Sequence, residues 1–108
     1  MYKRQVLIEE NCEIGCGATI DRGSMSNTVI AKNTYLDNQI HIAHNVKIGK
    51  NSIIGSNTII EHDVEIGENC TIGSQVVLKN SIIGKNVVIQ DGCKIGLKGF
   101  GFIPKKKQ

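Results

Sequence analysis

The chain is poor in the residues that fill most globular cores. Its 108 residues include two Phe, two Tyr and no Trp, and they include a single Pro. A core without aromatic side chains has to be narrow and filled by aliphatic and small residues. With one Pro, almost every backbone N–H can donate, as a chain built of hydrogen-bonded strands requires. We therefore expect one narrow β-domain spanning residues 1–108.

Other absences limit the partners and the compartment. The net charge of +3 is too small to argue for nucleic acid, no apolar run is long enough for a membrane span, and no signal peptide opens the chain. The four cysteines lack the spacing of a disulfide framework or a zinc site. We expect reduced thiols, a cytoplasmic protein, no membrane span, no nucleic-acid partner and no bound metal.

What the sequence has in abundance is a six-residue repeat. Every sixth residue is Ile or Leu without interruption at Ile30, Leu36, Ile42, Ile48, Ile54, Ile60, Ile66, Ile72 and Leu78. A period of six fits neither an amphipathic helix nor a plain strand over fifty residues. It is typical of a solenoid in which each hexad is one short strand plus a corner. The sequence predicts an all-β parallel β-helix with strands of three to five residues and essentially no helix.

A second period sets the size of one coil. Asn33, Asn51 and Asn69 lie eighteen residues apart, which is three hexads. Asn tolerates left-handed backbone angles better than most residues, as tight corners require. Fifteen hexads therefore make about five triangular coils with Ile pointing inward. Cys12, Cys70 and Cys93 fall at small inward positions of this pattern.

The repeat is interrupted in three places. Ile20 and Ile30 are ten residues apart, so an insertion near residues 21–28 should project as a loop at a corner. Leu78 and Ile83 are five apart, which is a one-residue deletion. Residues 97–108 leave the repeat as an irregular end. Loops carry function more often than coils, although a neutral bulge is the simpler interpretation of most insertions.

The histidines are the residues most suited to chemistry. His44 and His62 are eighteen apart, so they should occupy one column on adjacent coils, about 4.8 Å apart. His41 should also face outward. Exposed polar residues are the simplest interpretation of His41 and His62, and the spacing does not resemble the zinc ligands of hexapeptide carbonic anhydrases. A neutral imidazole at His44 is a competent general base for attack on an acyl thioester, with backbone N–H groups to hold the oxyanion.

Several motifs resemble the UDP-3-O-acylglucosamine N-acyltransferase family of lipid A biosynthesis. They are Thr-Ile-Asp-Arg-Gly at 19–23, Asp-Asn at 37–38, Ile-Ala-His-Asn-Val-Lys-Ile-Gly at 42–49 and Gly-Phe-Gly-Phe at 99–102. The related O-acyltransferases typically have Ile-His-Arg-Gly and Ala-His-Asp at the matching places, so Asp21 and Asn45 favour the N-acyltransferase. The resemblance is specific over residues 6–49 and 91–102 and generic between them.

The resemblance implies a fold, a reaction and site residues. It implies a left-handed parallel β-helix, a homotrimer, and transfer of a 3-hydroxyacyl chain from acyl carrier protein to the amine of a UDP-sugar. The donor is a phosphopantetheine thioester and no further cofactor is implied. The catalytic base of the family falls on His44. We expect Asp37, Asn45 and His62 to bind substrate.

The sequence also departs from the family pattern. The family places Gly-Phe-Gly-Phe before Ile-Asp-Arg-Gly, whereas here it comes last, so the motif order is rotated. The N-terminal uridine-binding domain and the later coils have no counterpart, and Asn80 and Ser81 stand near the place of a second functional histidine. We expect a partial or permuted enzyme. The alternatives are a non-catalytic β-helix scaffold or fragment, and another hexapeptide acyltransferase acting on a sugar nucleotide.

Overall fold

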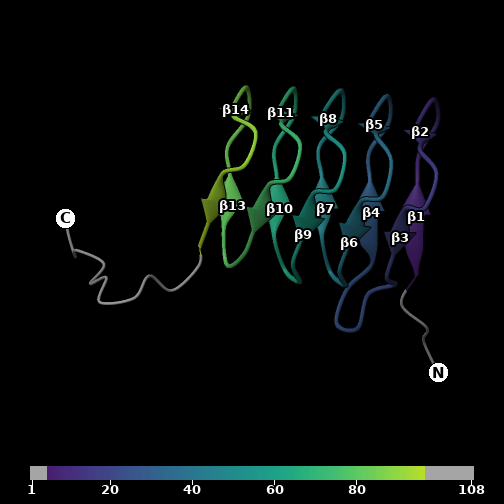
Figure 1. Ribbon diagram of the computed structural model, residues 1–108. Helices are drawn as coiled ribbons and strands as arrows, with labels where there is room; N and C mark the ends of the chain where they lie inside the picture. The colour runs from purple at the N-terminus through teal and green to yellow at the C-terminus, as the bar shows by residue number, and fades with distance from the viewer. Residues whose placement is uncertain (1–4, 97–108) are drawn as a thin grey trace.

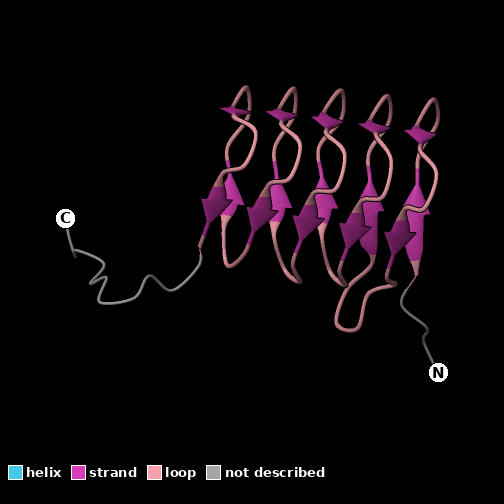
Figure 2. Ribbon diagram, in the orientation of Figure 1, coloured by secondary structure: helices cyan, strands magenta, loops and turns pink. Residues whose placement is uncertain are grey.

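A computed structural model describes residues 5–96 as five stacked coils, each built from three short strands (Figure 1). Among these residues every regular element is a strand, and none is a helix (Figure 2). The predicted all-β parallel β-helix is therefore confirmed. The predicted irregular end at 97–108 lies outside the described residues.

The strands stack into three five-stranded parallel sheets, one for each side of the prism. The first sheet holds β1 (Val6–Ile8), β4 (Thr28–Ile30), β7 (Lys47–Ile48), β10 (Glu65–Ile66) and β13 (Ile82–Ile83). The second holds β2 (Glu13–Ile14), β5 (Tyr35–Leu36), β8 (Ile53–Ile54), β11 (Thr71–Ile72) and β14 (Val88–Ile89). The third holds β3 (Thr19–Ile20), β6 (His41–Ile42), β9 (Ile59–Ile60), β12 (Val77–Leu78) and β15 (Lys94–Ile95).

The strands are shorter than the sequence predicted. Two of them have three residues and the others have two, in place of the expected three to five. The corners account for the difference, because a hexad that turns through a sharp corner leaves little extended backbone. Each corner between described strands, except the one between β3 and β4, contains a residue with positive φ, such as Asn33 (62°), Asn51 (62°) and Asn69 (59°). Gln39, Asn45 and Asp63 adopt the same conformation at the other corners, with φ of 58°, 63° and 64°.

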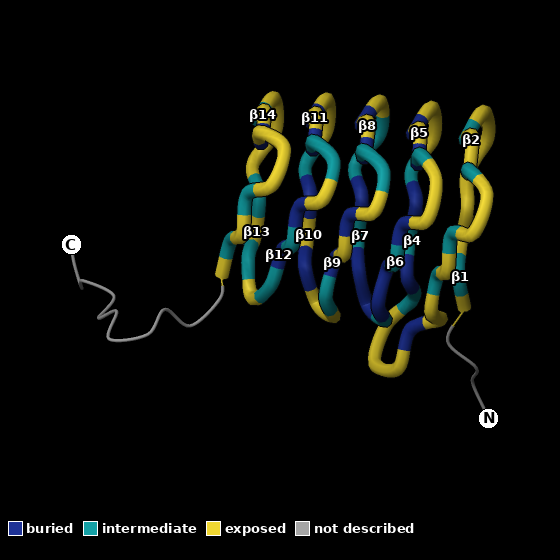
Figure 3. Tube along the Cα trace, in the orientation of Figure 1, coloured by how far each residue is buried: buried dark blue, intermediate teal, exposed yellow. Residues whose placement is uncertain are grey.

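The core is the predicted column of aliphatic residues. All nine positions from Ile30 to Leu78 are buried, with 3% exposure or less (Figure 3). Their neighbours in the core are smaller residues such as Val46, Val64 and Cys70. Each strand of the inner coils pairs in parallel register with the coils on either side, so Ile30 lies opposite Ile48 and Ile48 opposite Ile66. Burial of these side chains is the main stabilising term of the fold.

The one-residue deletion changes one side chain from inside to outside. The six-residue count from Leu78 places Ile82 at a small inward position. Ile82 is instead 80% exposed, on β13, and pairs with Glu65 of the coil before it. Because the coil is one residue short, Ile83 takes the inward place, and Asn80 takes the corner conformation with a φ of 49°. Ser81 lies between them, and its Oγ donates to the carbonyl of Lys79 at 2.5 Å.

Candidate functional site

The insertion forms a loop at the corner where the third sheet meets the first. Residues 21–27 leave the coil after β3 and return at β4, and the loop projects beyond the stack in Figure 1. The loop is largely exposed (Figure 3). Gly23 within it is buried. A Cβ on Gly23 would lie 1.4 Å from the carbonyl oxygen of Ser26. The loop can therefore close in this shape only with glycine at position 23.

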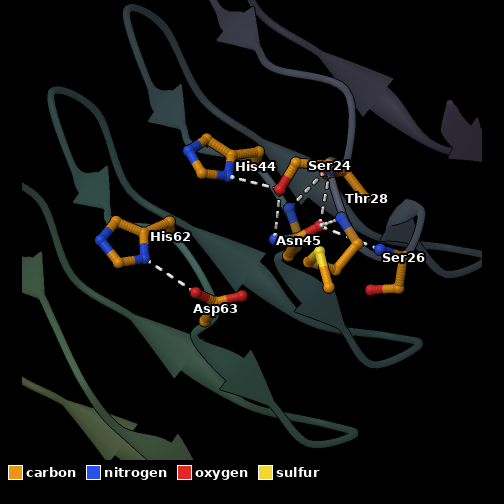
Figure 4. Close-up of polar contacts among 8 residues, drawn as sticks. Ser24, Ser26, Thr28, His44, Asn45, His62 and Asp63 are labelled. Atoms are coloured by element: carbon orange, nitrogen blue, oxygen red, sulfur yellow. Dashed lines mark hydrogen bonds and ion pairs between the residues drawn. The ribbon is translucent and has the colours of Figure 1, made fainter. Parts of the chain in front are cut away.

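The side chain of Asn45 holds this loop against the next coil (Figure 4). Asn45 is buried, and its Oδ1 accepts the backbone N–H groups of Ser24 (2.8 Å), Met25 (3.1 Å) and Ser26 (3.2 Å). Its Nδ2 donates to Ser24 Oγ at 3.0 Å. The backbone N–H of Asn45 donates to Thr28 Oγ1 at 2.9 Å. One buried amide thus satisfies three consecutive loop N–H groups, and this fixes the shape of the loop.

A lysine fastens the far end of the loop. Lys47 follows Asn45 by two residues, at the start of β7. Its Nζ donates to Ser26 Oγ at 2.9 Å and to the carbonyl oxygen of Asn27. The loop is therefore held along its length by two side chains from one short segment of the next coil.

His44 lies beside the loop on the same corner. It is half-buried, and its Nδ1 lies 3.5 Å from Ser24 Oγ. In Figure 4 the other ring nitrogen points away from the loop. The backbone of His44 is held by the ladder, since its carbonyl accepts the N–H of Asp63 at 3.1 Å. A rigid backbone and an oriented ring are the features that a general base requires.

His62 stacks on His44 one coil further along. The two rings are nearly parallel, with an interplanar angle of 9° and centroids 5.4 Å apart. The predicted single column of these residues is therefore confirmed. His62 Nδ1 lies 2.8 Å from Asp63 Oδ2. The pKa of Asp63 is lowered, first by the hydrogen bond from His62 and then by one from Asn45, so its carboxylate is ionised at neutral pH.

The remaining predicted site residues lie elsewhere. Asp37 occupies the corner after β5, a different edge of the prism, and its Oδ1 accepts the backbone N–H of Asn38 at 2.8 Å. His41 lies on β6, where its Nδ1 is 2.7 Å from Thr19 Oγ1 and its Nε2 is 3.8 Å from Asp21. The structure thus brings His44, Asn45 and His62 together and leaves Asp37 apart.

Three residues of this corner were not singled out in the sequence. Ser24 and Lys47 belong to the loop contact, and Asp63 belongs to the His62 pair. The spacing of Asp63 contained a signal, because it lies eighteen residues after Asn45 and so occupies the same corner position. The contacts of Ser24 depend on the loop conformation, which no repeat determines.

Among residues 5–96 no group of three or more His, Cys, Asp or Glu side chains is arranged to hold a metal ion. Within the same range no helix is long and apolar enough to cross a membrane. The four cysteines are free thiols.

A comparison with protein families agrees with the repeat. The profile described as "Bacterial transferase hexapeptide (six repeats)" matches residues 27–62 and 53–80, which together make half of the chain. The chain belongs to this family of bacterial hexapeptide transferases. The hexapeptide corner that carries His44, Asn45 and His62 lies inside the matched region.

Curated relatives of this hexapeptide transferase are named UDP-3-O-acylglucosamine N-acyltransferase. The protein from Bradyrhizobium diazoefficiens is 57% identical over 42 residues, which is 39% of this chain and 12% of the relative. The one from Rhizobium rhizogenes is 54% identical over 43 residues, 40% of this chain and 12% of the relative. The match thus spans about an eighth of the length of these relatives. A solved acetyltransferase domain of PglB from Neisseria gonorrhoeae aligns at 25% identity with a TM-score of 0.33, over 84% of this chain and 54% of that one.

Proposed function

We propose that this chain carries the acyl-transfer site of an N-acyltransferase. The reaction moves a 3-hydroxyacyl group from the phosphopantetheine thioester of acyl carrier protein to the amine of UDP-3-O-acylglucosamine. The names of the relatives support the acceptor, UDP-3-O-acylglucosamine, and the transfer of an acyl group to its nitrogen. The observation that carries the proposal is the placement of His44, a half-buried imidazole on a rigid corner beside an anchored loop.

In this proposal His44 acts as the general base. Ser24 Oγ already accepts a hydrogen bond from Asn45 Nδ2, and its second lone pair can accept the Nδ1–H of His44. This arrangement leaves Nε2 of His44 unprotonated, on the side that points away from the loop in Figure 4. Nε2 takes the proton from the amine as the amine nitrogen attacks the thioester carbon. The C–N bond forms, the C–S bond breaks, and the products are an amide and a thiol.

Asn45 contributes to this site by holding the loop. Its amide is bonded to the backbone N–H and the hydroxyl of Ser24, and the residue is 6% exposed. We assign its role to positioning Ser24 and therefore the His44 ring. Asp37 remains a candidate substrate contact on its own edge of the prism, and His62 a candidate at the His44 edge.

The experiment that tests the proposal is acyl transfer by matched histidine variants. His44→Gln should lower turnover of a 3-hydroxyacyl thioester with an amine acceptor by about a hundredfold or more, the usual scale for a positioned base. His41→Gln is the control, because His41 is also partly exposed but is bonded to Thr19 on another side of the coil. Full activity of His44→Gln would contradict the assignment.

The same assay separates the alternative functions. A scaffold without chemistry would release no thiol with either acceptor. A different hexapeptide acyltransferase would prefer a sugar hydroxyl to the amine. Equal wild-type rates with a UDP-3-O-acylglucosamine and its 3-hydroxyl precursor would argue against the amine as the specific acceptor.

We further propose that the chain forms a homotrimer. On the second sheet the outward positions Tyr35, Ile53 and Val88 are 40%, 47% and 65% exposed, and Tyr35 lies opposite Ile53 in the ladder. Flat apolar faces of this kind associate readily. Light scattering at micromolar concentration should give three times the monomer mass, and Ile53→Lys should lower it. The four free thiols support a cytoplasmic location.

A further inference from the structure

The two stacked histidines have different partners. His62 Nδ1 faces the carboxylate of Asp63 at 2.8 Å, whereas His44 Nδ1 faces the hydroxyl of Ser24 at 3.5 Å. A positively charged ring at His62 would therefore be paired with an ionised carboxylate. A positively charged ring at His44 would have a neutral partner. An ion pair with a carboxylate is therefore available to His62 and not to His44.

The free edges of the two rings lie on one side of the molecule. In Figure 4 each ring directs its Nδ1 toward its own partner, and the other nitrogens of the two rings point to the same side. The rings are stacked with centroids 5.4 Å apart, about one strand spacing. Two such nitrogen atoms can face two neighbouring atoms of one substrate complex. In acyl transfer those atoms are the attacking amine and the departing sulfur.

We propose that His62, held by Asp63, is the general acid that protonates the leaving thiol while His44 accepts the proton of the amine. This inference rests on the proposed acyl-transfer function and adds a second catalytic residue to it. Two charged groups near the pair have partners of their own, since Asp21 faces His41 and Lys47 is bonded to the loop.

The proton balance of the step is complete. The amine nitrogen forms a bond to the thioester carbon and gives a proton to Nε2 of His44. The C–S bond breaks, and its electron pair takes the proton from Nε2 of His62. One amide and one thiol are formed. His44 then holds the extra proton and His62 is neutral, so a proton passing between them through solvent restores the starting state without a co-reactant.

The test compares two thioesters with the same acyl group and different leaving thiols. An alkyl thioester of the phosphopantetheine type leaves as a basic thiolate that needs a proton. A thiophenyl ester leaves as a weakly basic thiolate that does not. His62→Gln should lower kcat by about a hundredfold with the alkyl thioester and by about threefold or less with the aryl thioester. Asp63→Asn should show the same pattern with a smaller loss.

Controls separate this inference from the proposed function. His44→Gln should lose activity with both thioesters, because the amine must be deprotonated in either case. His41→Gln should behave as wild type. Equal losses of His62→Gln on both thioesters, with His44→Gln inactive, would overturn the general-acid role alone. A wild-type chain that turns over neither thioester would overturn the proposed function and this inference with it.

A spectroscopic measurement tests the pair without turnover. Nitrogen-15 correlation spectra of the imidazoles should show the His62 proton on Nδ1 in the neutral ring, because Asp63 accepts it. Asp63→Asn should shift that proton toward Nε2. A neutral His62 in the wild-type chain that carries its proton on Nε2 would overturn the inference, whatever the assay gives.

Discussion

The side-chain oxygen of Asn45 accepts the backbone N–H of Ser24 at 2.8 Å, across a separation of 21 residues in the chain. Through this bond a residue of one coil shapes a loop that belongs to the coil before it. The loop in turn places a hydroxyl beside His44. The geometry of the base therefore depends on a residue with no direct part in the chemistry.

Replacing Asn45 by Ala should destabilise the protein and loosen the loop. The change leaves three loop N–H groups without their acceptor and puts Ala at a φ of 63°. Asn51→Ala is a matched control, because Asn51 has a φ of 62° and its replacement adds only the cost of placing Ala in the left-handed conformation. We expect Asn45→Ala to lower the free energy of unfolding by about 1–3 kcal/mol more than Asn51→Ala, measured by urea denaturation. Equal losses would contradict the role of the amide.

Removing the Ser24 hydroxyl should slow catalysis, and it should also cost some stability because Asn45 Nδ2 loses its acceptor. Ser24→Ala deletes the group that faces His44 Nδ1, so the ring is held less well. A single hydrogen bond of this kind corresponds to about a two- to tenfold loss of kcat. Ser26→Ala serves as the comparison, since its hydroxyl accepts from Lys47 and does not reach the histidine. If the two variants lose activity equally, the hydroxyl does not act through His44.

The Asp63 carboxylate should make the stability of the fold depend on pH in the acidic range. Its folded-state pKa lies below the ordinary 3.8, so its contribution is fully present above that pH. The contribution is lost as the pH falls through the folded value. Asp63→Asn should therefore have a lower Tm than the wild type at about pH 5, and the difference should shrink as the pH falls below 3.8. A gap that persists at low pH would indicate a cause other than this charge.

Adjacent isoleucines on β8 should differ sharply in their effect on stability. Ile54 is fully buried and Ile53 is 47% exposed on the outer face. Ile54→Ala should cost about 2–5 kcal/mol, and Ile53→Ala about 0.5 kcal/mol in an isolated chain. Chemical denaturation of both variants checks this. Similar losses would mean that the inward column is misplaced.

The sequence predicted the core and the histidine column because both follow from a covalent repeat. Once three hexads close a coil, Ile30 must lie over Ile48, and His44 over His62. The strand lengths were overestimated, because a hexad pattern does not say how many residues the corner uses. Ile82 is exposed because the missing residue is lost from the corner before β13. A six-residue count does not show at which point of the coil the deletion lies.

The contacts of the loop depended on three-dimensional detail that periodicity lacks. The sequence assigned Asn45 to substrate binding on resemblance, while its contacts in the structure point inward to Ser24, Met25 and Ser26. The carboxylate partner of His62 could have been predicted from the sequence. Asp63 follows it directly at a corner position, where the backbone turns the carboxylate back toward the ring.

The pairing of every coil with its immediate neighbours has a consequence for how the molecule comes apart. Strands of the first sheet pair in the order β1, β4, β7, β10 and β13, so a coil has at most two partners. Such a chain behaves like a one-dimensional array. Unfolding of an end coil breaks one interface with a neighbour, whereas unfolding of an inner coil breaks two. Opening therefore starts from either end and moves inward. The corner with His44 and His62 sits on the second and third of the five described coils. Opening that begins at the C-terminal coil therefore reaches this corner only after two other coils have opened.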